Sequence, residues 1–275
     1  MTGSGPVPAD AEGPPPDIDI SVAHVARVYD YWLGGKTNFT PDQVAARAAM
    51  RAAPHVAEGV RGNRAFLARA VRYLVGQAGV RQFLDIGTGI PAADNTHEVA
   101  QDVARECRVV YVDNDPIVLS HARALLTSGT KGTTAYLDED LRDVAELIRA
   151  AAGTLDLAEP VAVMLIGILQ CIPDEDDPAG IIKQLMDALP SGSYLAISHP
   201  ASDIDVVGIR NLAYRLHELM PMELRFRSRA EVAAFFDGLE LVDPGVVPIL
   251  AWHPEGGAPG DPRAAYYYGA VGRKP

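Results

Sequence analysis

The sequence predicts an α/β fold with a mostly parallel sheet, and two observations carry that prediction. From residue 79 onward, short apolar runs alternate with helix-length amphipathic segments, and strands that alternate with helices form parallel sheets. In addition, two of these runs end in a carboxylate: the first continues through Asp85 into a Gly-x-Gly turn, and the second ends at Asp113. Ligands of such sheets bind outside the carboxyl ends of the strands.

The alternation predicts five parallel strands, at residues 82–86, 108–112, 133–137, 160–166 and 193–198. Helices are expected between them, near 92–105, 116–127, 141–151 and 178–189. Two further helices, near 204–219 and 229–236, precede two late β segments, 239–252 and 265–271. Because the Gly- and Pro-rich stretch 254–262 holds no helix, the late segments are expected to form an antiparallel hairpin. The expected sheet therefore has seven strands.

Helical periodicity also precedes the first strand. Apolar residues recur at helical spacing from Val22 to Trp32, Pro41 opens a second helix, and a third spans about 56–77. Residues 1–17 are dominated by Pro, Gly, Ala and Asp and have little to bury. The predicted organisation is a disordered tail (1–17), an N-terminal helical extension that acts as a lid (18–78) and a ligand-binding domain (79–275).

Composition limits the partners. The chain has 275 residues, is 48% hydrophobic and carries a net charge of −12, which argues against a nucleic-acid partner because phosphate backbones attract clustered Lys and Arg. The two cysteines, Cys107 and Cys171, suggest free thiols in a reducing compartment. No apolar run reaches the roughly 20 residues of a membrane span. We expect a cytoplasmic protein without a membrane partner, and no oligomeric state is predicted.

The first two strand ends indicate a nucleoside-containing cofactor. Gly87 and Gly89 permit close backbone approach and positive φ. Asp85 can accept hydrogen bonds from an amino group, and S-adenosylmethionine carries an ammonium, whereas the pyrophosphate of a dinucleotide would be repelled there. Asp113 corresponds in spacing to the acid that binds both ribose hydroxyls. These residues favour S-adenosylmethionine.

Two alternatives remain open. Gly87-x-Gly89-x-x-Ala92 also fits the dinucleotide fingerprint, although Pro91 lacks the N–H that an anion at a helix start would need. The turn could equally be a glycine turn that binds no ligand. A dehydrogenase would additionally need a hydride-transfer site, and none is evident in the sequence.

Several blocks along the chain resemble a known family. They are Arg27–Phe39 (RVYDYWLGGKTNF), Arg61–Leu67 (RGNRAFL), Gln82–Gly89 (QFLDIGTG), Tyr111–Pro116 (YVDNDP), Asp140–Asp143 (DLRD), Pro173–Pro178 (PDEDDP) and Gly192–Leu195 (GSYL). Together they resemble an actinobacterial S-adenosylmethionine-dependent methyltransferase-like family, formerly a domain of unknown function. The resemblance extends from Ser21 to the C-terminus. It implies a Rossmann-like class I methyltransferase fold with S-adenosylmethionine as cofactor, and no established methyl acceptor.

The family pattern extends the expected cofactor site. By analogy, Asp140 accepts from the adenine amino group while the N–H of Leu141 donates to the ring; alternatively, Asp140 only caps the following helix. Arg64 is expected to pair with the methionine carboxylate, with a surface role as the alternative. Two neighbouring positions complete the expected cofactor site, Asn114 and Gly167.

The acceptor side is expected after the fourth strand and under the N-terminal helices. Gln170 follows that strand and cannot act as a base, and the absence of an Asn/Asp-Pro-Pro-aromatic motif argues against methylation of DNA amines. His199, at the end of the fifth strand, is the candidate general base, unless it is simply a hydrogen-bonded strand-end residue. The lid is expected to add further acceptor-side residues: Tyr29, Tyr31, Asn38 and Phe39.

No metal site is predicted, because the acidic run Asp174–Asp177 is more typical of a solvated loop and helix start. The sequence therefore predicts an S-adenosylmethionine-dependent methyltransferase that acts on a small molecule. The alternative is a protein that binds S-adenosylmethionine or S-adenosylhomocysteine without catalysis, because a fold alone does not establish an activity.

Overall fold

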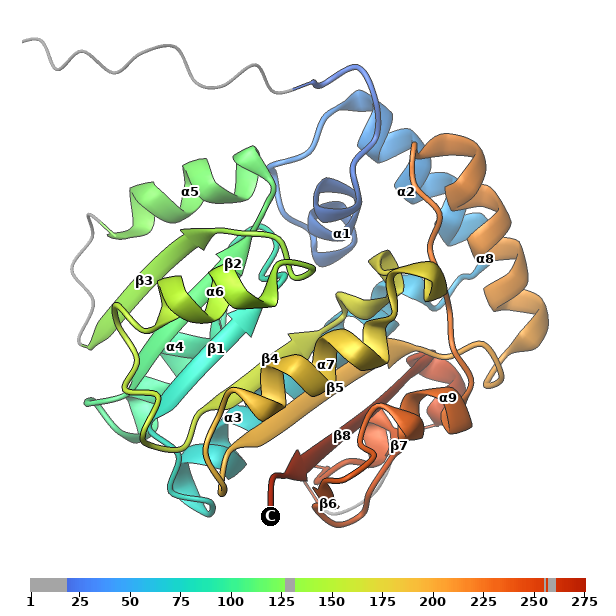
Figure 1. The fold of residues 1–275 in the computed structure, drawn as a ribbon. Helices are drawn as coiled ribbons and strands as arrows, with labels where there is room; N and C mark the ends of the chain where they lie inside the picture. The colour runs from blue at the N-terminus through green and yellow to red at the C-terminus, as the bar shows by residue number, and fades with distance from the viewer. Residues whose placement is uncertain (1–18, 127–131, 255, 257–260) are drawn as a thin grey trace, which may run out of the picture.

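A computed structural model of the chain describes residues 19–126, 132–254, 256 and 261–275, so the predicted tail over residues 1–17 lies outside the described residues. Eight strands form one sheet in the order β3-β2-β1-β4-β5-β8-β6, with β7 also paired to β8 (Figure 1). The strands are β1 Gln82–Ile86, β2 Arg108–Asp113, β3 Thr133–Asp138, β4 Ala162–Ile166, β5 Tyr194–Pro200, β6 Glu240–Leu241, β7 Val247–Pro248 and β8 Tyr267–Arg273. The first five are mutually parallel, which confirms the predicted fold class.

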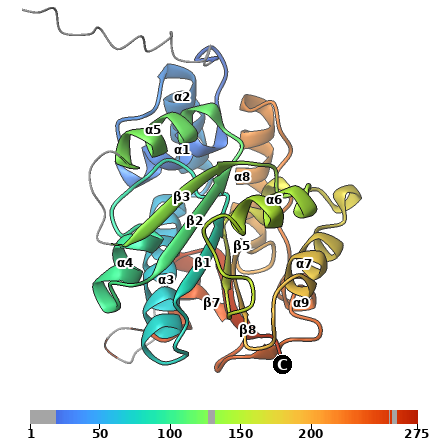
Figure 2. The same ribbon diagram turned by 60° about the vertical axis from the view of Figure 1, so that its left-hand side comes forward.

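The helices cover both faces of this sheet. They are α1 Val25–Leu33, α2 Thr40–Ala52, α3 Val56–Gly76, α4 Thr96–Val103, α5 Pro116–Leu126, α6 Val144–Ala151, α7 Pro178–Asp187, α8 Val206–Leu219 and α9 Arg229–Ala234. Figure 2 shows α3 and α4 on one side of the sheet and α6, α7 and α9 on the other. Successive residues of β1 supply both layers: Phe83 packs with the α3 cluster and Leu84 with the α6–α7 cluster, as the two-residue period of a strand requires.

The N-terminal helices divide between two layers. Phe66 and Leu74 of α3 belong to the core beneath the sheet, so this part of the expected extension is built into the α/β unit. In contrast, α1 and α2 form a separate apolar cluster with α8. There, Trp32 packs in the cluster and donates from Nε1 to the carbonyl of Ala46 at 3.2 Å. This cluster sets α1 across the carboxyl ends of the parallel strands (Figure 1).

The C-terminal β segments differ from the prediction in detail. The expected continuous segment 239–252 is divided into β6 and β7, because Pro244 has no N–H to donate and Gly245 turns with φ 78°. Only β8 runs antiparallel to β5, and β6 and β7 pair with β8 rather than with the parallel strands. The sheet consequently has eight strands where seven were predicted.

Two helices begin later than predicted, and side-chain caps explain both. Helix α4 starts at Thr96 instead of residue 92, because Asn95 and Glu98 form a capping box. Helix α6 starts at Val144, where Asp143 accepts from the amide of Glu146. The prediction that Asp140 caps this helix is therefore wrong. The Asp140 carboxylate instead accepts hydrogen bonds from the side chain of Asn114 and the amide of Arg142.

Candidate functional site

A cleft of about 230 Å³ lies at the carboxyl ends of β1, β2 and β4 and beneath α1. Sequence-predicted residues from all of these elements line it. They are Tyr29, Arg64, Asp85, Gly87, Gly89, Asp113, Asn114, Asp140, Leu141, Gly167 and Gln170. The fold thus brings together eleven of the fifteen predicted site residues, and the remaining four (Tyr31, Asn38, Phe39 and His199) are not among those that line this cleft.

The glycine turn after β1 is closely packed against the loop after β4. Gly87 has φ 72°, and a Cβ there would lie 2.4 Å from Cγ1 of Ile168. Gly89 has φ 66°, and its N–H donates to Oδ2 of Asp113 at 2.9 Å. The other Asp113 oxygen accepts from the amide of Asp115 at 3.0 Å. Asp113 therefore fixes the glycine turn to the end of β2, and burial raises the pKa of its carboxyl group.

Asp85 is a buried carboxyl group at the base of the cleft. Its side chain is 5% exposed and accepts from the hydroxyl of Thr96 at 2.6 Å. Burial raises its pKa to about 6, while the hydroxyl and the Arg64 charge act in the opposite direction. A cation bound beside Asp85 would favour its ionised form.

Helix α3 contributes two adjacent side chains with unpaired atoms. Asn63 is 1% exposed and donates from Nδ2 to the hydroxyl of Tyr29 at 3.0 Å. Arg64 donates from Nη2 to the carbonyls of Ala93 and Asp94 at 2.8 and 2.9 Å. Among the described residues, neither Oδ1 of Asn63 nor Nε of Arg64 has a hydrogen-bond partner, although both atoms are buried. Two successive residues of the cleft lining thus each carry one buried polar atom without a partner among the described residues, an acceptor on Asn63 and a donor on Arg64.

The far end of the cleft is a network around Asp140. Asn114 donates from Nδ2 to one Asp140 oxygen at 2.9 Å, and the Arg142 amide donates to the other at 2.8 Å. The Arg142 guanidinium also pairs with Asp176 at 2.7 Å. Burial of Asp140 would raise its pKa, but these hydrogen bonds and the Arg142 charge bring it below its ordinary value. Asp140 is thus held as a carboxylate at the cleft wall.

The loop after β4 closes the near end of the cleft. Gln170 is 6% exposed and donates from Nε2 to the carbonyl of Gly167 at 2.5 Å. In the described part of the chain, its Oε1 is a buried acceptor without a partner. The neighbouring Cys171 thiol has its pKa raised to about 12 by burial, so it is not a nucleophile near neutral pH.

His199 does not lie in the cleft, and the prediction of a general base is corrected. Its ring is 0% exposed. Arg227 donates from Nη1 to His199 Nε2 at 3.1 Å, so Nδ1 carries the proton and donates to the carbonyl of Pro200 at 2.9 Å. Burial lowers the pKa of His199 to about 4. Both ring nitrogens are hydrogen-bonded, so His199 is a hydrogen-bonded residue at the end of a strand.

Three lid residues also lie away from the cleft lining. The hydroxyl of Tyr31 accepts from Arg47 of α2, and the Arg27 guanidinium stacks on the ring of Phe39. Asn38 donates to the Asp30 carboxylate at 2.8 Å. These contacts connect α1 to α2 and to the turn between them. Tyr31, Asn38 and Phe39 thus make contacts within the N-terminal helices, and their expected acceptor role stays a prediction.

Several cleft residues were missed at the sequence level. Asn63 and Thr96 line the cleft, as do His24 and Asp115, whose Nδ1 and Oδ2 lie 3.0 Å apart. This pair connects the segment before α1 to the loop after β2. Asn63 stands in the Arg61–Leu67 block and Asp115 in the Tyr111–Pro116 block, so the block resemblance was the available signal.

The comparisons with known proteins decide the family. A family model described as S-adenosyl methyltransferase matches residues 11–275. The chain belongs to this family. A DUF574 family protein from Streptomyces avermitilis is 46% identical, with a TM-score of 0.89 over 94% of this chain and 99% of that one. A proposed methyltransferase from Thermobifida fusca is 38% identical, with a TM-score of 0.87 over 95% and 98%. A search of curated proteins gave no match.

Membership of the S-adenosyl methyltransferase family confirms the resemblance stated from the sequence and identifies S-adenosylmethionine as the cofactor of the family. It decides against the dinucleotide reading of the glycine turn. The described residues of this chain contain no group of three or more His, Cys, Asp or Glu side chains arranged to hold a metal ion. None of its described helices has the length and apolar character to cross a membrane.

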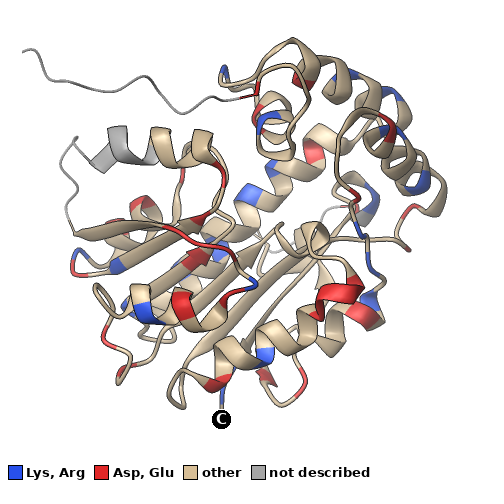
Figure 3. Ribbon diagram, turned by 45° about the horizontal axis from the view of Figure 1, so that its top comes forward, with Lys and Arg blue, Asp and Glu red and all other residues tan. Residues whose placement is uncertain are grey.

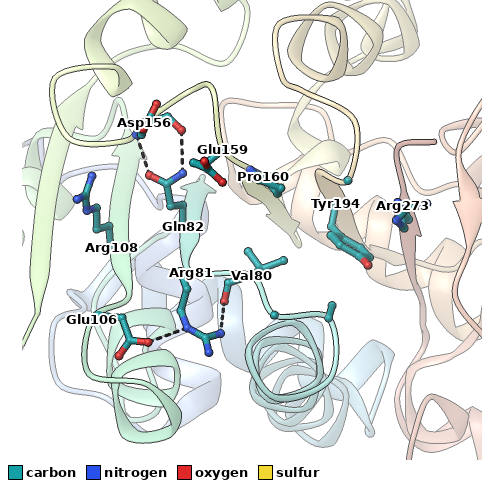
Figure 4. Close-up of a pocket in the computed structure, with 13 residues that line it drawn as sticks. Val80, Arg81, Gln82, Glu106, Arg108, Asp156, Glu159, Pro160, Tyr194 and Arg273 are labelled. Carbon is teal, nitrogen blue, oxygen red and sulfur yellow. Dashed lines mark hydrogen bonds and ion pairs between the residues drawn. The ribbon is translucent and has the colours of Figure 1, made fainter.

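A second depression of the methyltransferase fold, about 500 Å³, lies at the opposite edge of the sheet (Figure 4). Several of its polar side chains have partners: Gln82 exchanges hydrogen bonds with the backbone of Asp156, and Arg81 pairs with Glu106 at 2.8 Å. Among the described residues, the buried side-chain polar atoms that lack a hydrogen-bond partner all belong to residues outside this depression. The cleft at the carboxyl edge is therefore the candidate site.

Charged residues are distributed over many of the described elements. Figure 3 shows Lys and Arg residues spread over many elements and interspersed with Asp and Glu. In the acidic run, Asp174 pairs with Arg225 and Arg227 at 2.9 and 2.7 Å, and Asp177 caps α7 by accepting from the amide of Gly180. These carboxylates are accordingly used in ion pairs and in a helix cap.

Proposed function

We propose that this chain binds S-adenosylmethionine in the cleft and transfers its methyl group to a small molecule. One observation carries the proposal: the unpaired acceptor Oδ1 of Asn63 and the unpaired donor Nε of Arg64 lie on successive residues of a cleft that Asp85 also lines. The amino-acid end of the cofactor offers the complement, since its ammonium donates and its carboxylate accepts. Buried polar atoms cost free energy until such partners arrive.

The remaining predicted residues fit the nucleoside part. Each carboxylate oxygen accepts more than one hydrogen bond, so Asp113 can hold the glycine turn and still accept from ribose hydroxyls. Asp140, oriented by Asn114, would accept from the adenine amino group, and the amide of Leu141 would donate to the ring. This assignment extends from β1 to β3, as expected for a ligand across the carboxyl edge of a parallel sheet.

Catalysis would depend on positioning. The cofactor, when bound, supplies a methyl group activated by a sulfonium centre. The residues of this chain hold the acceptor in line and exclude water, a contribution of about 7–11 kcal/mol in favourable cases. Tyr29 and Leu33 of α1 line the cleft, which supports a lid role for the N-terminal helices. The described cysteines are free thiols, which fits a reducing compartment such as the cytoplasm.

Calorimetric titration with S-adenosylmethionine, S-adenosylhomocysteine and NAD tests the binding step. We expect binding of the first two only, and a loss of affinity of about tenfold or more in Arg64→Met, because a charge-assisted bond is removed. Arg61→Met is the matched control, since Arg61 lies on the same helix and its side chain is 58% exposed. Binding of NAD alone, or equal losses in both variants, would contradict the assignment.

A second measurement separates catalysis from binding alone. The protein is incubated with methyl-labelled S-adenosylmethionine and a protein-free metabolite extract, and label in a small-molecule product is measured. Turnover eliminates the non-catalytic alternative. Tight binding of both cofactor forms without any turnover would instead favour a sensor of S-adenosylmethionine or S-adenosylhomocysteine.

A further inference from the structure

A small apolar cavity adjoins the cleft between α1, α8 and the start of β8. It measures about 40 Å³ and shares the lining residues Val25, Tyr29 and Gln170 with the cleft, so the two spaces lie on either side of these three residues. Aliphatic and aromatic side chains form nearly all of its wall, and no charged residue is among the described residues that line it. They include Tyr29, Gln170, Leu212, Leu216 and Tyr267.

Gln170 supplies an unsatisfied acceptor at the junction. Its Nε2 is held by the Gly167 carbonyl, and its own main-chain carbonyl accepts from the amide of Arg225 at 2.8 Å. These contacts fix the side chain while its buried Oε1 lacks a partner among the described residues. An amide oxygen only accepts hydrogen bonds. A ligand that satisfies it must therefore bring an N–H or O–H group.

Building on the proposed function, we propose that the methyl acceptor is a small uncharged amine or alcohol. Its N–H or O–H donates to Oε1 of Gln170, and its apolar part enters the cavity between α1 and α8. An ionic group in this apolar cavity would lose its hydration without gaining a counter-ion. At about 40 Å³ the cavity accommodates only the edge of a small apolar group, so most of a ring such as that of an aromatic amine would lie on the cleft side of Gln170.

A neutral amine suits this site better than an alcohol. The amine nitrogen stays beside Gln170 at the border with the cleft. Its lone pair forms the new N–C bond, the electron pair of the broken S–C bond stays on sulfur, and the resulting cation releases its proton to water on the cleft side. No base is needed in the cavity. A hydroxyl group would need one, but burial raises the pKa of the wall residues Tyr29 and Tyr267, and His199 lies outside the cavity wall.

The test is calorimetric binding of aniline to the protein saturated with S-adenosylhomocysteine. Fluorobenzene is similar in size and lacks the donor, phenol carries a hydroxyl instead, and benzoate and benzylammonium are charged. We expect aniline and phenol to bind about tenfold or more tightly than fluorobenzene, because each satisfies a buried acceptor that fluorobenzene leaves without a hydrogen bond. The charged compounds should bind more weakly than fluorobenzene. In Gln170→Leu, the ratio between aniline and fluorobenzene should fall toward one.

Variants of α8 locate the apolar part. Leu212→Phe fills the cavity and should weaken aniline binding about tenfold, while Leu219→Phe is a matched control on an exposed position of the same helix. Leu216→Phe repeats the test if the first variant does not fold, and S-adenosylhomocysteine affinity reports folding. Absence of S-adenosylhomocysteine binding in the wild-type protein would defeat the proposed function itself. Three outcomes would overturn only the acceptor proposal. The protein binds S-adenosylhomocysteine but not aniline, the variants with a filled cavity bind aniline as the wild type does, or benzoate binds as tightly as aniline.

Discussion

Asn63 donates from Nδ2 to the hydroxyl of Tyr29 at 3.0 Å, and this bond joins α3, which packs beneath the sheet, to α1, which crosses the carboxyl edge. One amide thereby joins α1 to α3 through its nitrogen, while its buried oxygen has no partner among the described residues. The same side chain links the α/β core to the proposed amino-acid end of the cofactor.

This relationship predicts unequal effects of two substitutions. Tyr29→Phe removes only the connection between α1 and α3 and should cost about 1 kcal/mol of unfolding free energy. Asn63→Leu also removes the free oxygen and should weaken S-adenosylhomocysteine binding about tenfold more than Tyr29→Phe does. Urea denaturation and calorimetry measure the two quantities. Equal affinity in the two variants would mean that Oδ1 of Asn63 does not contact the cofactor.

Gly87 and Gly89 should respond differently to alanine. Both have positive φ, which costs a residue with a side chain about 1–2 kcal/mol. At Gly89, a Cβ meets no atom within 4 Å, whereas at Gly87 it would lie 2.4 Å from Ile168. We expect Gly87→Ala to lower the unfolding free energy more and to abolish cofactor binding. The double variant Gly87→Ala/Ile168→Ala should recover part of the loss, and a strictly additive result would show that this contact is not the cause.

The raised pKa of Asp85 predicts a pH-dependent cost. Because the folded value is about 6 against an ordinary 3.8, the folded protein binds the proton more tightly than the unfolded chain does. Stability from this group is therefore present at low pH and is lost as pH rises between these values, by about 3 kcal/mol at most. Asp85→Asn does not titrate, so its unfolding free energy relative to wild type should increase between pH values of about 4 and about 7. Urea denaturation at both pH values measures this difference, and an unchanged difference would show that Asp85 has an ordinary pKa.

The buried ion pair between Arg27 and Asp42 should matter more than an exposed one. Arg27 is 2% exposed and its Nε lies 3.1 Å from the Asp42 carboxylate, which also accepts from the amides of His24 and Phe39. Arg27→Met leaves a buried charge unpaired and should cost about 3–5 kcal/mol. Lys183→Met breaks an exposed pair with Asp187 and should change stability by less than about 1 kcal/mol. Chemical denaturation compares the two variants, and similar losses would refute the role of burial.

Local sequence patterns were sufficient to locate the five parallel strands and the edge of the sheet at which the cleft lies. The bounds of β1 agree with the prediction at both ends, because an apolar run is closed there by Gly87. Asp113 was predicted correctly at the end of β2, since its position follows from the same pattern. These features depend on residues within one strand–turn unit.

The errors in the site concern contacts between distant parts of the chain. Sequence placed His199 at a strand end but could not show that Arg227, 28 residues later, occupies its Nε2. The role of Asn63 depends on Tyr29, 34 residues earlier. Tyr31 turns to Arg47 of α2, a choice that follows from how two helices pack. Such tertiary contacts decide which side of a helix or strand faces the cleft. The spacing of apolar residues along one element does not reveal that orientation.

His199 supplies the last prediction, because its environment makes it a structural residue with a definite pH signature. Its pKa is lowered to about 4 by burial, with the Arg227 charge acting in the same direction, whereas an unfolded His titrates near 6.5. Stability from the neutral ring is therefore complete above about pH 6.5 and is lost as pH falls toward 4, by about 3 kcal/mol in total. His199→Asn should remove this dependence and lower the unfolding free energy at neutral pH. Its affinity for S-adenosylhomocysteine should stay within about twofold of wild type, because the ring does not line the cleft. Urea denaturation at the two pH values and calorimetry measure both quantities, and a loss of affinity without a loss of stability would restore His199 to the functional site.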